Sequence, residues 1–177
     1  MDDKKINKPV TVWRLLTQRL VKMFFRQQPS TPPLDFSELA SKRRSIFIRH
    51  LDCGSCNGCE LELNALNNPI YDLERFGLQF EASPRHADVL VMTGPFTRNL
   101  EEAARLTFEA MSEPRQIVTI GDCAKDGGIF KESYAIKPRP AMLEEAIKAT
   151  AIHVPGCPPT PEAILKELAK LSPMPSD

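Results

Sequence analysis

Short apolar runs alternate with amphipathic segments from residue 45 to the end of the chain. The apolar runs are rich in Ile, Val and Leu and are bounded by Gly, Pro or Asp, which is typical of buried β-strands. They are SIFIRHL (45–51), LQFEA (78–82), DVLVMTG (88–94), QIVTIG (116–121) and AIHVP (151–155). Because helical segments separate these runs, the pattern predicts an α/β domain with a parallel sheet and helices on both faces.

The segments between the apolar runs show helical spacing. Segment 98–112 repeats its apolar residues every three or four positions, namely Leu100, Ala103, Ala104, Phe108 and Met111,. Segment 140–150 is a further helix, and segment 160–171 begins with Thr160 as a cap and Pro161 at the first helical position,. Segment 60–76 reads as helical at first and is interrupted at 67–69.

The change in sequence character predicts that residues 1–44 are a separate arm ahead of a domain that covers 45–177. PVTVWRLLTQRLVKMFFRQQ (9–28) predicts a basic amphipathic helix, and QQPSTPP (27–33) predicts an extended Pro-rich linker,. The apolar face carries Trp13, Leu16, Leu20, Met23 and Phe24. Such a helix lies on a membrane surface or against a membrane subunit, or it packs on its own domain as an ordinary helix.

Composition excludes several classes of protein. The 177 residues carry a formal charge of zero, which argues against a dedicated nucleic-acid binder,. No apolar run approaches the roughly 20 residues of a membrane span, and no secretory signal is recognisable, so we expect a cytoplasmic protein. Five cysteines fit a disulfide framework poorly, and in a reducing compartment they are available to bind metal,.

The cysteines follow the ends of three predicted strands. Cys53, Cys56 and Cys59 follow 45–51, Cys123 follows 116–121, and Cys157 follows 151–155. Since the carboxyl ends of parallel strands meet at one edge of a sheet, all five sulphurs should converge there. The compact CxxCxxC run with a remote Cys-Pro favours an iron-sulphur cluster over zinc, and spacing alone selects Cys53, Cys56, Cys59 and Cys157 as its ligands.

Four motifs carry a resemblance to a known family. CNGCELE, SPRHADVLVMTG, GDCAKDGGIF and VPGCPPTPEAIL occur in this order. Together they resemble the small subunit of membrane-bound, energy-conserving nickel-iron hydrogenases of the formate hydrogenlyase type, a family related to the 20 kDa subunit of respiratory complex I. The resemblance covers 45–171 and implies a flavodoxin-like, doubly wound fold that holds one 4Fe-4S cluster.

The resemblance also implies a ligand set. By position within the motifs, the ligands are Cys56, Cys59, Cys123 and Cys157, and Cys53 becomes an additional cysteine. This set differs from the spacing-based set in exchanging Cys53 for Cys123, and we follow the family because its motifs match position by position. Glu62 occupies a position where relatives carry an acidic residue, as part of a proton path or an interface, although a solvated helix glutamate is the simpler interpretation.

The implied role is electron transfer without catalysis. The chain would relay electrons between a ferredoxin-like iron-sulphur subunit and a large subunit with the nickel-iron site, where protons and hydrogen interconvert. The chain lacks the second pair of CxxC motifs that would hold nickel. With integral membrane subunits as further partners, the expected location is the cytoplasmic side of the cell membrane, as a peripheral subunit.

Two alternatives remain at this point. The complex I subunit resembles this chain and passes electrons to quinone, but its first two cysteines are adjacent, whereas Asn57 and Gly58 separate Cys56 from Cys59 here. A structural zinc-binding assembly module is the alternative of a different class, and it predicts no redox signal.

Overall fold

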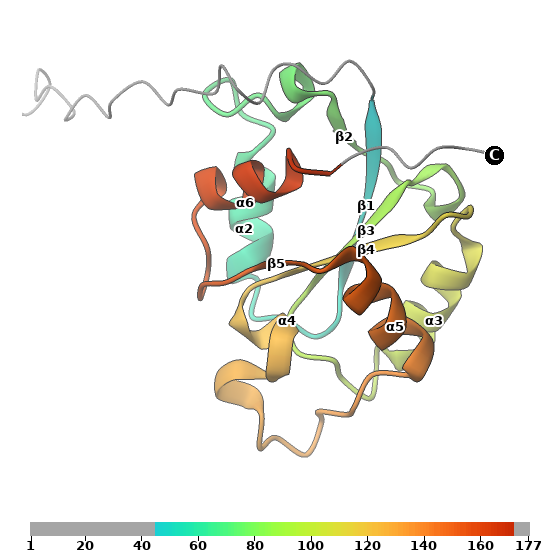
Figure 1. Cartoon of the computed structure of the whole chain (residues 1–177). Coiled ribbons are helices and arrows are strands. Elements are labelled where there is room, and N and C mark those ends of the chain that lie inside the picture. Colours follow the sequence, from blue (N-terminus) through green and yellow to red (C-terminus); the bar gives the residue numbers. More distant parts are fainter. Residues whose placement is uncertain (1–44, 172–177) are drawn as a thin grey trace, which may run out of the picture. The chain divides into compact units, whose positions relative to one another are not determined.

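Five parallel strands form one sheet in the computed structural model, which describes residues 45–171 (Figure 1). The strands are β1 (Ile46–Asp52), β2 (Leu78–Phe80), β3 (Val89–Thr93), β4 (Gln116–Ile120) and β5 (Ile152–Val154). Their order across the sheet is β2-β1-β3-β4-β5, the order of the flavodoxin-like doubly wound sheet,. The predicted fold class is therefore confirmed, whereas the predicted N-terminal helical arm lies outside the described residues.

The strand register brings the carboxyl ends of four strands level with one another. Asp52 of β1 pairs with Thr93 of β3, Thr93 pairs with Ile120 of β4, and Ile120 pairs with Val154 of β5. The loops that leave these ends therefore share one edge of the sheet, which is the edge where open parallel sheets bind ligands.

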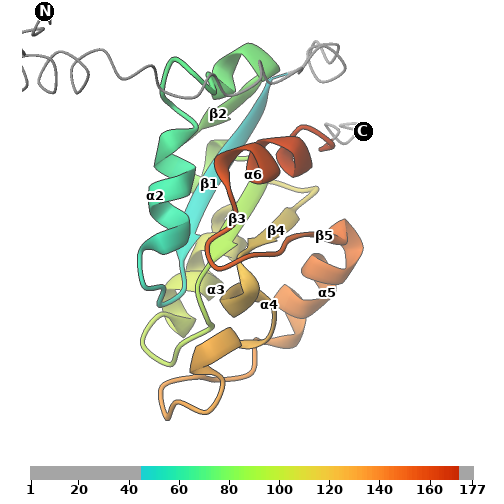
Figure 2. The same ribbon diagram turned by 90° about the vertical axis from the view of Figure 1, so that its left-hand side faces the viewer.

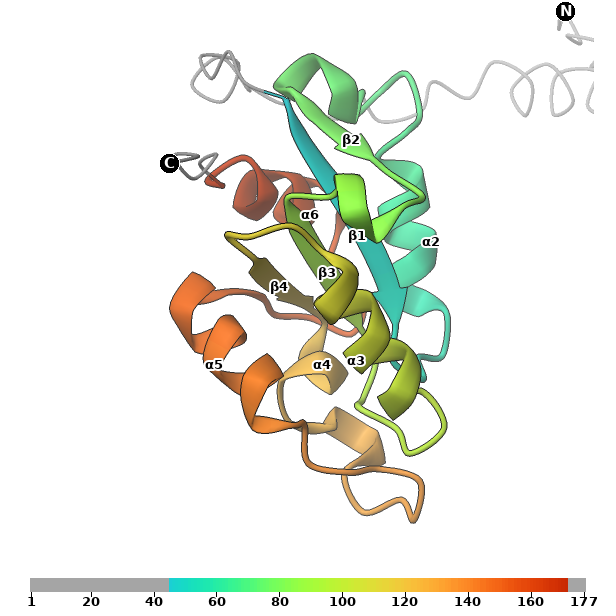
Figure 3. The same ribbon diagram turned by 90° about the vertical axis from the view of Figure 1, so that its right-hand side faces the viewer.

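Two helices cover each face of the sheet. Helices α2 (Gly58–Ala65) and α6 (Pro161–Leu168) lie on the face turned to the viewer in Figure 2, and α3 (Glu101–Ala110) and α5 (Ala141–Thr150) lie on the face turned to the viewer in Figure 3. A short helix, α4 (Asp122–Asp126), follows β4. Because both faces are covered, the central strand β3 is buried at all five positions,.

The core has two halves that are separated by the sheet. Val89 and Val91 of β3 belong to the half under α2 and α6, and Leu90 and Met92 belong to the half under α3 and α5. This alternation follows from the period of two in side-chain direction along a strand. The apolar runs are continuous in the sequence because both halves need apolar residues.

Local signals in the sequence explain two helix boundaries. The side chain of Thr160 accepts a hydrogen bond from the backbone N–H of Ala163, so it caps α6 as predicted,. Helix α2 ends at Ala65, and the Asn68 side chain then accepts hydrogen bonds from the N–H groups of Ile70 and Tyr71. The predicted interruption is thus an asparagine-stabilised turn.

Three short 3-10 helices complete the described part of the chain. They are η1 (Leu73–Phe76), η2 (Pro84–His86) and η3 (Gly128–Phe130). No helix within residues 45–171 is long and apolar enough to cross a membrane.

Candidate metal centre

Four of the five cysteines surround one small cavity at the carboxyl edge of the sheet. The cavity has a volume of about 120 Å³, and its lining includes Cys56, Cys59, Cys123 and Cys157. Cys56 precedes α2 and Cys59 lies in its first turn, Cys123 lies in α4, and Cys157 lies between β5 and α6. The structure thus brings together the four cysteines that the family resemblance selects.

Cys53 lies apart from this cavity. Its side chain is 1 % exposed and belongs to the half of the core under α3 and α5. The backbone also fixes it there, because its N–H donates to the Thr93 carbonyl and its carbonyl accepts from the N–H and the hydroxyl of Thr97. The spacing-based ligand set, which contains Cys53 in place of Cys123, does not match this arrangement.

Two glycines make room for the sulphurs. A Cβ atom on Gly121 would lie 2.6 Å from the Cys59 sulphur, and one on Gly128 would lie 3.0 Å from the Cys123 sulphur. Both glycines have positive φ, and Gly121, at φ 88° and ψ 151°, adopts a conformation that is essentially restricted to glycine,. The sulphurs therefore occupy space that any other residue type would fill.

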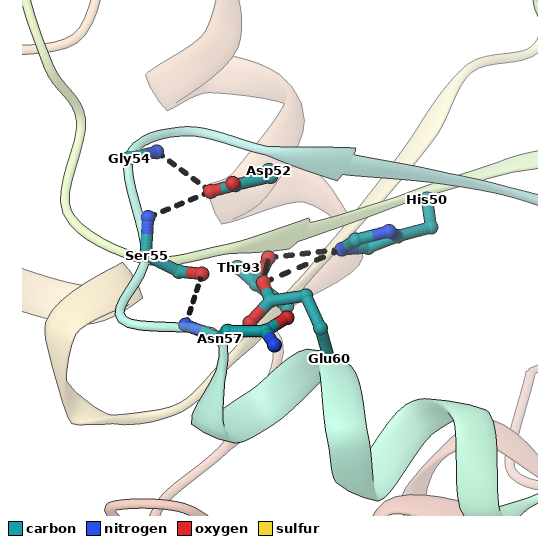
Figure 4. A network of polar contacts seen from close by, with 7 residues as sticks. All are labelled: His50, Asp52, Gly54, Ser55, Asn57, Glu60 and Thr93. Carbon is teal, nitrogen blue, oxygen red and sulfur yellow. Dashed lines mark hydrogen bonds and ion pairs between the residues drawn. The ribbon is translucent and has the colours of Figure 1, made fainter.

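The loop that carries Cys56 is folded by a carboxylate. Asp52, at the end of β1, accepts hydrogen bonds of 2.7 Å from the N–H groups of Gly54 and Ser55 (Figure 4). The Ser55 hydroxyl then accepts from the N–H of Asn57 at 3.0 Å, and Asn57 adopts the left-handed conformation just before α2. These bonds hold the chain in a tight turn between the strand and the helix.

The segments that carry Cys123 and Cys157 are tied to each other by hydrogen bonds. The N–H of Asp122 donates to the Gly156 carbonyl at 2.9 Å, and the Asp122 carboxylate accepts from the Gly156 N–H at 2.8 Å. A third bond joins the Gly121 N–H to the Val154 carbonyl at 2.8 Å. The two cysteines are consequently held in a fixed relation although 33 residues separate them in the sequence.

The four thiols influence one another electrostatically. Burial is the largest cause that raises the pKa of Cys59, and together with Glu60 and the thiols of Cys123, Cys56 and Cys157 it brings this pKa to about 12. Burial, with contributions from Cys157 and Cys56, also raises the pKa of Cys123, while a hydrogen bond from the Ile129 backbone opposes this rise. Four thiolates at this place would repel one another, so a positively charged group between them would be stabilised.

The pKa of Cys53 has a different origin. Burial is the largest cause that raises it, Asp52 and Glu60 also raise it, Arg139 lowers it, and the resulting pKa is about 12. None of the other cysteines contributes. Cys53 is thus separate from the cavity in its electrostatics as well as in its packing.

A polar network lies beside Cys59 and joins α2 to the sheet (Figure 4). The buried Thr93 hydroxyl donates to Oε1 of Glu60, whose side chain is 11 % exposed. Nε2 of His50 lies 2.9 Å from the Thr93 hydroxyl oxygen and 3.7 Å from Glu60 Oε1. Since the threonine proton is directed to Glu60, His50 donates its Nε2 proton to the threonine oxygen.

Glu60 is a residue that the sequence analysis missed. Its Oε2 atom is buried and has no hydrogen-bond partner among residues 45–171. Glu62, which the sequence analysis selected, is half-buried on α2. Burial and the hydrogen bond that the Tyr71 hydroxyl donates to Glu162 raise the pKa of Tyr71, and Glu62 adds a smaller contribution. Both glutamates lie within three residues of Cys59 in the sequence. The orientation of α2 about its own axis, relative to β1 and β3, decides which of the two side chains packs against the sheet.

Two of the three histidines lie in strands, as the strand pattern predicts. His50 is in β1 and His153 is in β5, where its Nδ1 lies 2.9 Å from the Thr119 hydroxyl. His86 is exposed in η2. Among the residues that the structure describes, no three His, Cys, Asp or Glu side chains lie close enough to hold a single metal ion.

Comparison with known proteins identifies the family. Residues 56–171 match the family described as NADH ubiquinone oxidoreductase, 20 Kd subunit. This match includes all four cysteines that line the cavity. The chain belongs to this family, which confirms the resemblance found in the motifs.

Two curated relatives resemble the chain over most of the domain. A probable membrane-bound hydrogenase subunit mbhJ of Pyrococcus furiosus is 44% identical over 122 residues, which are 69% of this chain and 71% of that protein. Formate hydrogenlyase subunit 7 of Escherichia coli is 39% identical over 129 residues, which are 73% of this chain and 49% of that protein. The chain therefore spans about half the length of the Escherichia coli relative.

A solved structure shows the same architecture. A chain in the structure of the membrane-bound sulfane sulfur reductase, an archaeal respiratory membrane complex, aligns with a TM-score of 0.55 and 28% identity. The alignment covers 77% of this chain and 75% of that chain.

Proposed function

We propose that this chain is the electron-transfer subunit of a membrane-bound hydrogenase and holds one 4Fe-4S cluster through Cys56, Cys59, Cys123 and Cys157. The observation that carries the proposal is that four cysteines from three separate segments of the chain line one cavity. Four thiolates are the usual ligands of such a cluster. A single zinc ion would instead need four sulphurs about 2.3 Å from one point.

The residues of the site suit a cluster in further respects. Gly121 and Gly128 leave space beside the sulphurs of Cys59 and Cys123, and the Ile129 backbone forms a hydrogen bond with the Cys123 sulphur. Hydrogen bonds to the sulphurs, charge and solvent exposure tune the potential of iron-sulphur clusters. When bound, the cluster supplies reversible one-electron transfer, and the chain's own residues position it and shield part of it from water.

The partners follow from the relatives and belong to the same proposal. The names of the Pyrococcus and Escherichia relatives favour a hydrogenase complex, in which a ferredoxin-like subunit gives electrons and a nickel-iron large subunit takes them. Cys56 and Cys157 are exposed in this chain, so one side of the site is open to a neighbouring subunit. We further propose that the subunit is peripheral, on the cytoplasmic side of the membrane, beside integral membrane subunits.

Metal analysis and electron paramagnetic resonance of the reduced protein test the proposal. We expect about four iron atoms per chain and the signal of one 4Fe-4S cluster. One zinc ion and no iron would contradict electron transfer and restore the zinc-binding assembly module. Co-purification of a nickel-bearing subunit would support the hydrogenase, whereas a quinone-reducing assembly would support the role of the complex I subunit.

Serine substitutions test the ligand set. Cys123→Ser should lose most of its iron, because it removes a thiolate from the cavity, and Cys53→Ser should keep its iron, because that thiol is buried in the core. Iron per chain and the amplitude of the paramagnetic signal are the measurements. The opposite pattern would restore the set with Cys53.

A further inference from the structure

Arg139 binds the end of the helix that carries Cys123. The carbonyl groups of Ala124 and Lys125 lie in the last turn of α4, where a helix leaves its carbonyl groups without partners of its own,. Nη2 of Arg139 donates to the Lys125 carbonyl at 2.9 Å and also donates to the Ala124 carbonyl. These two residues directly follow Cys123 in the sequence. Arg139 is thus a cap for α4 that a later part of the chain supplies.

The backbone around Arg139 is held in place before its side chain makes these bonds. Segment 127–138 leaves the end of α4 and returns to the start of α5, as Figures 1 and 3 show. An antiparallel bridge between Thr97 and Ile136 fixes the returning part of this segment. Both neighbours of Arg139 in the sequence are prolines, which restrict their own backbone and that of the residue before them,.

Glu144 fixes the orientation of the guanidinium group. Nη1 of Arg139 donates to Oε1 of Glu144 at 2.6 Å, and Glu144 belongs to α5. The Arg139 side chain is 12% exposed and the Glu144 side chain is 34% exposed. Because the guanidinium group is a rigid planar fork, bonds at both terminal nitrogens determine how it lies. The positive charge is therefore held against α4, and the negative charge lies on α5.

The charge of Arg139 acts on groups near the metal centre. Burial raises the pKa of Cys53, and Arg139 opposes this rise. Burial also lowers the pKa of His153, and Arg139 adds a smaller contribution in the same direction. Cys53 follows β1 and His153 lies in β5, the two strands after which Cys56 and Cys157 emerge. A charge that is removed from water acts more strongly on such neighbours than an exposed one.

We infer that Arg139 is a positioning residue that holds Cys123 in place through the carbonyl groups of α4 and raises the reduction potential of the proposed cluster. Four thiolates bring negative charge to the site, and reduction adds one electron there, with no bond formed or broken. A fixed positive charge nearby stabilises the reduced form more than the oxidised form. The inference rests on the proposed function and adds a residue outside the four ligands that adjusts the site.

Two glutamine variants should shift the reduction potential in opposite directions. Arg139→Gln removes the positive charge and leaves Glu144 without its partner, so the ratio of reduced to oxidised cluster at a fixed applied potential should fall about tenfold. This change corresponds to a potential about 59 mV lower for one electron. Glu144→Gln leaves the charge of Arg139 uncompensated, so the ratio should rise several-fold. A potentiometric titration of the full chain with its cluster bound, followed by electron paramagnetic resonance, measures both ratios. A merely structural role would not give shifts of opposite sign.

Arg139→Lys separates the charge from the hydrogen bonds. Lysine keeps the positive charge, so the ratio of reduced to oxidised cluster should stay within about twofold of the natural value. Lysine lacks the planar fork, so it cannot replace all the bonds to α4 and Glu144, and iron should be lost to a chelator several-fold faster. A potential equal to that of Arg139→Gln would overturn the electrostatic role.

The matched control is Arg105→Gln. Arg105 lies on α3, forms ion pairs with Glu102 and Glu109, and has a side chain that is 39% exposed. The control therefore removes an arginine and its ion pairs from a solvated surface, where such pairs contribute little. Its reduction potential and its rate of iron loss should equal those of the natural chain.

The outcomes distinguish this inference from the proposed function. A natural chain without iron would overturn both. A natural chain with iron whose potential is the same in Arg139→Gln and Glu144→Gln as in the unsubstituted protein would overturn the role of Arg139 alone. If Arg139→Gln loses its iron before the titration, Glu144→Gln decides, because it keeps the bonds from Arg139 to α4. A raised potential in that variant supports the inference, and an unchanged or lowered potential overturns it.

Discussion

Single residues decide which sulphurs can meet. Cys53 and Cys56 are three positions apart, yet the turn built on Asp52 and the left-handed Asn57 directs one into the core and the other toward the cavity. A CxxCxxC run in sequence does not reveal this turn, because the same spacing also occurs where all three cysteines are ligands. The positions of Glu60 and Glu62 in the sequence likewise do not show which of the two side chains packs against the sheet.

Gly121 is the residue whose replacement should disturb the site most directly. Gly121→Ala would place a Cβ atom 2.6 Å from the Cys59 sulphur and would strain the backbone at φ 88°. We expect a several-fold loss of iron per chain and a destabilisation of about 1–3 kcal/mol. The matched control is Gly58→Ala, whose Cβ would make only ordinary contacts of 3.6 Å or more. Equal iron content in both variants would contradict the close fit.

Protonation of His50 should make folding stability depend on pH. Burial lowers the pKa of His50 from 6.5, and Glu60 and Asp52 only partly oppose this effect. Below about pH 6.5 the unfolded chain binds a proton that the folded chain excludes, so the folded state loses stability as the pH falls through this window.

The measurement is the change in Tm between about pH 7.5 and pH 5.5. Over this interval, the Tm of the His50→Asn variant should fall less than the Tm of the natural chain, because asparagine does not titrate. The same measurement on His153→Asn is the comparison, because His153 is the other histidine in a strand and burial lowers its pKa as well. If the Tm of His50→Asn depends on pH as strongly as the Tm of the natural chain, groups other than His50 cause the dependence.

At the scale of elements, the strands were predictable and the segment after α4 was not. The strands are apolar runs because both faces of the sheet are covered, and their order of appearance fixes where the cysteine loops emerge,. Segment 127–138 has no apolar periodicity, and its path depends on positive φ at Gly127 and Gly128 and on the bridge between Thr97 and Ile136. Such long-range contacts leave no local signal in the sequence.

The paired loops after β4 and β5 should act as one unit. Asp122→Ala removes the acceptor of the Gly156 N–H and should loosen Cys157 relative to Cys123. We expect iron to be lost to a chelator several-fold faster, which optical absorbance can follow with time. Asp122→Asn keeps an oxygen that can accept this bond and should retain iron nearly as well as the natural chain. If both variants lose iron at the same rate, the negative charge rather than the hydrogen bond is responsible.

At the scale of the whole molecule, the segments that follow the first and the last strand of the sheet meet at the candidate metal centre. Cys56 follows the first strand and Cys157 follows the last, so 101 positions separate them in the sequence. The sheet must therefore be complete before all four sulphurs face one another, because β5 takes its place only beside β4. During synthesis, a ribosome-bound chain that lacks its last segment cannot yet offer four thiolates to the proposed cluster. Cluster insertion would then act as a checkpoint for finished folding, and iron content would report the fraction of chains that have passed it.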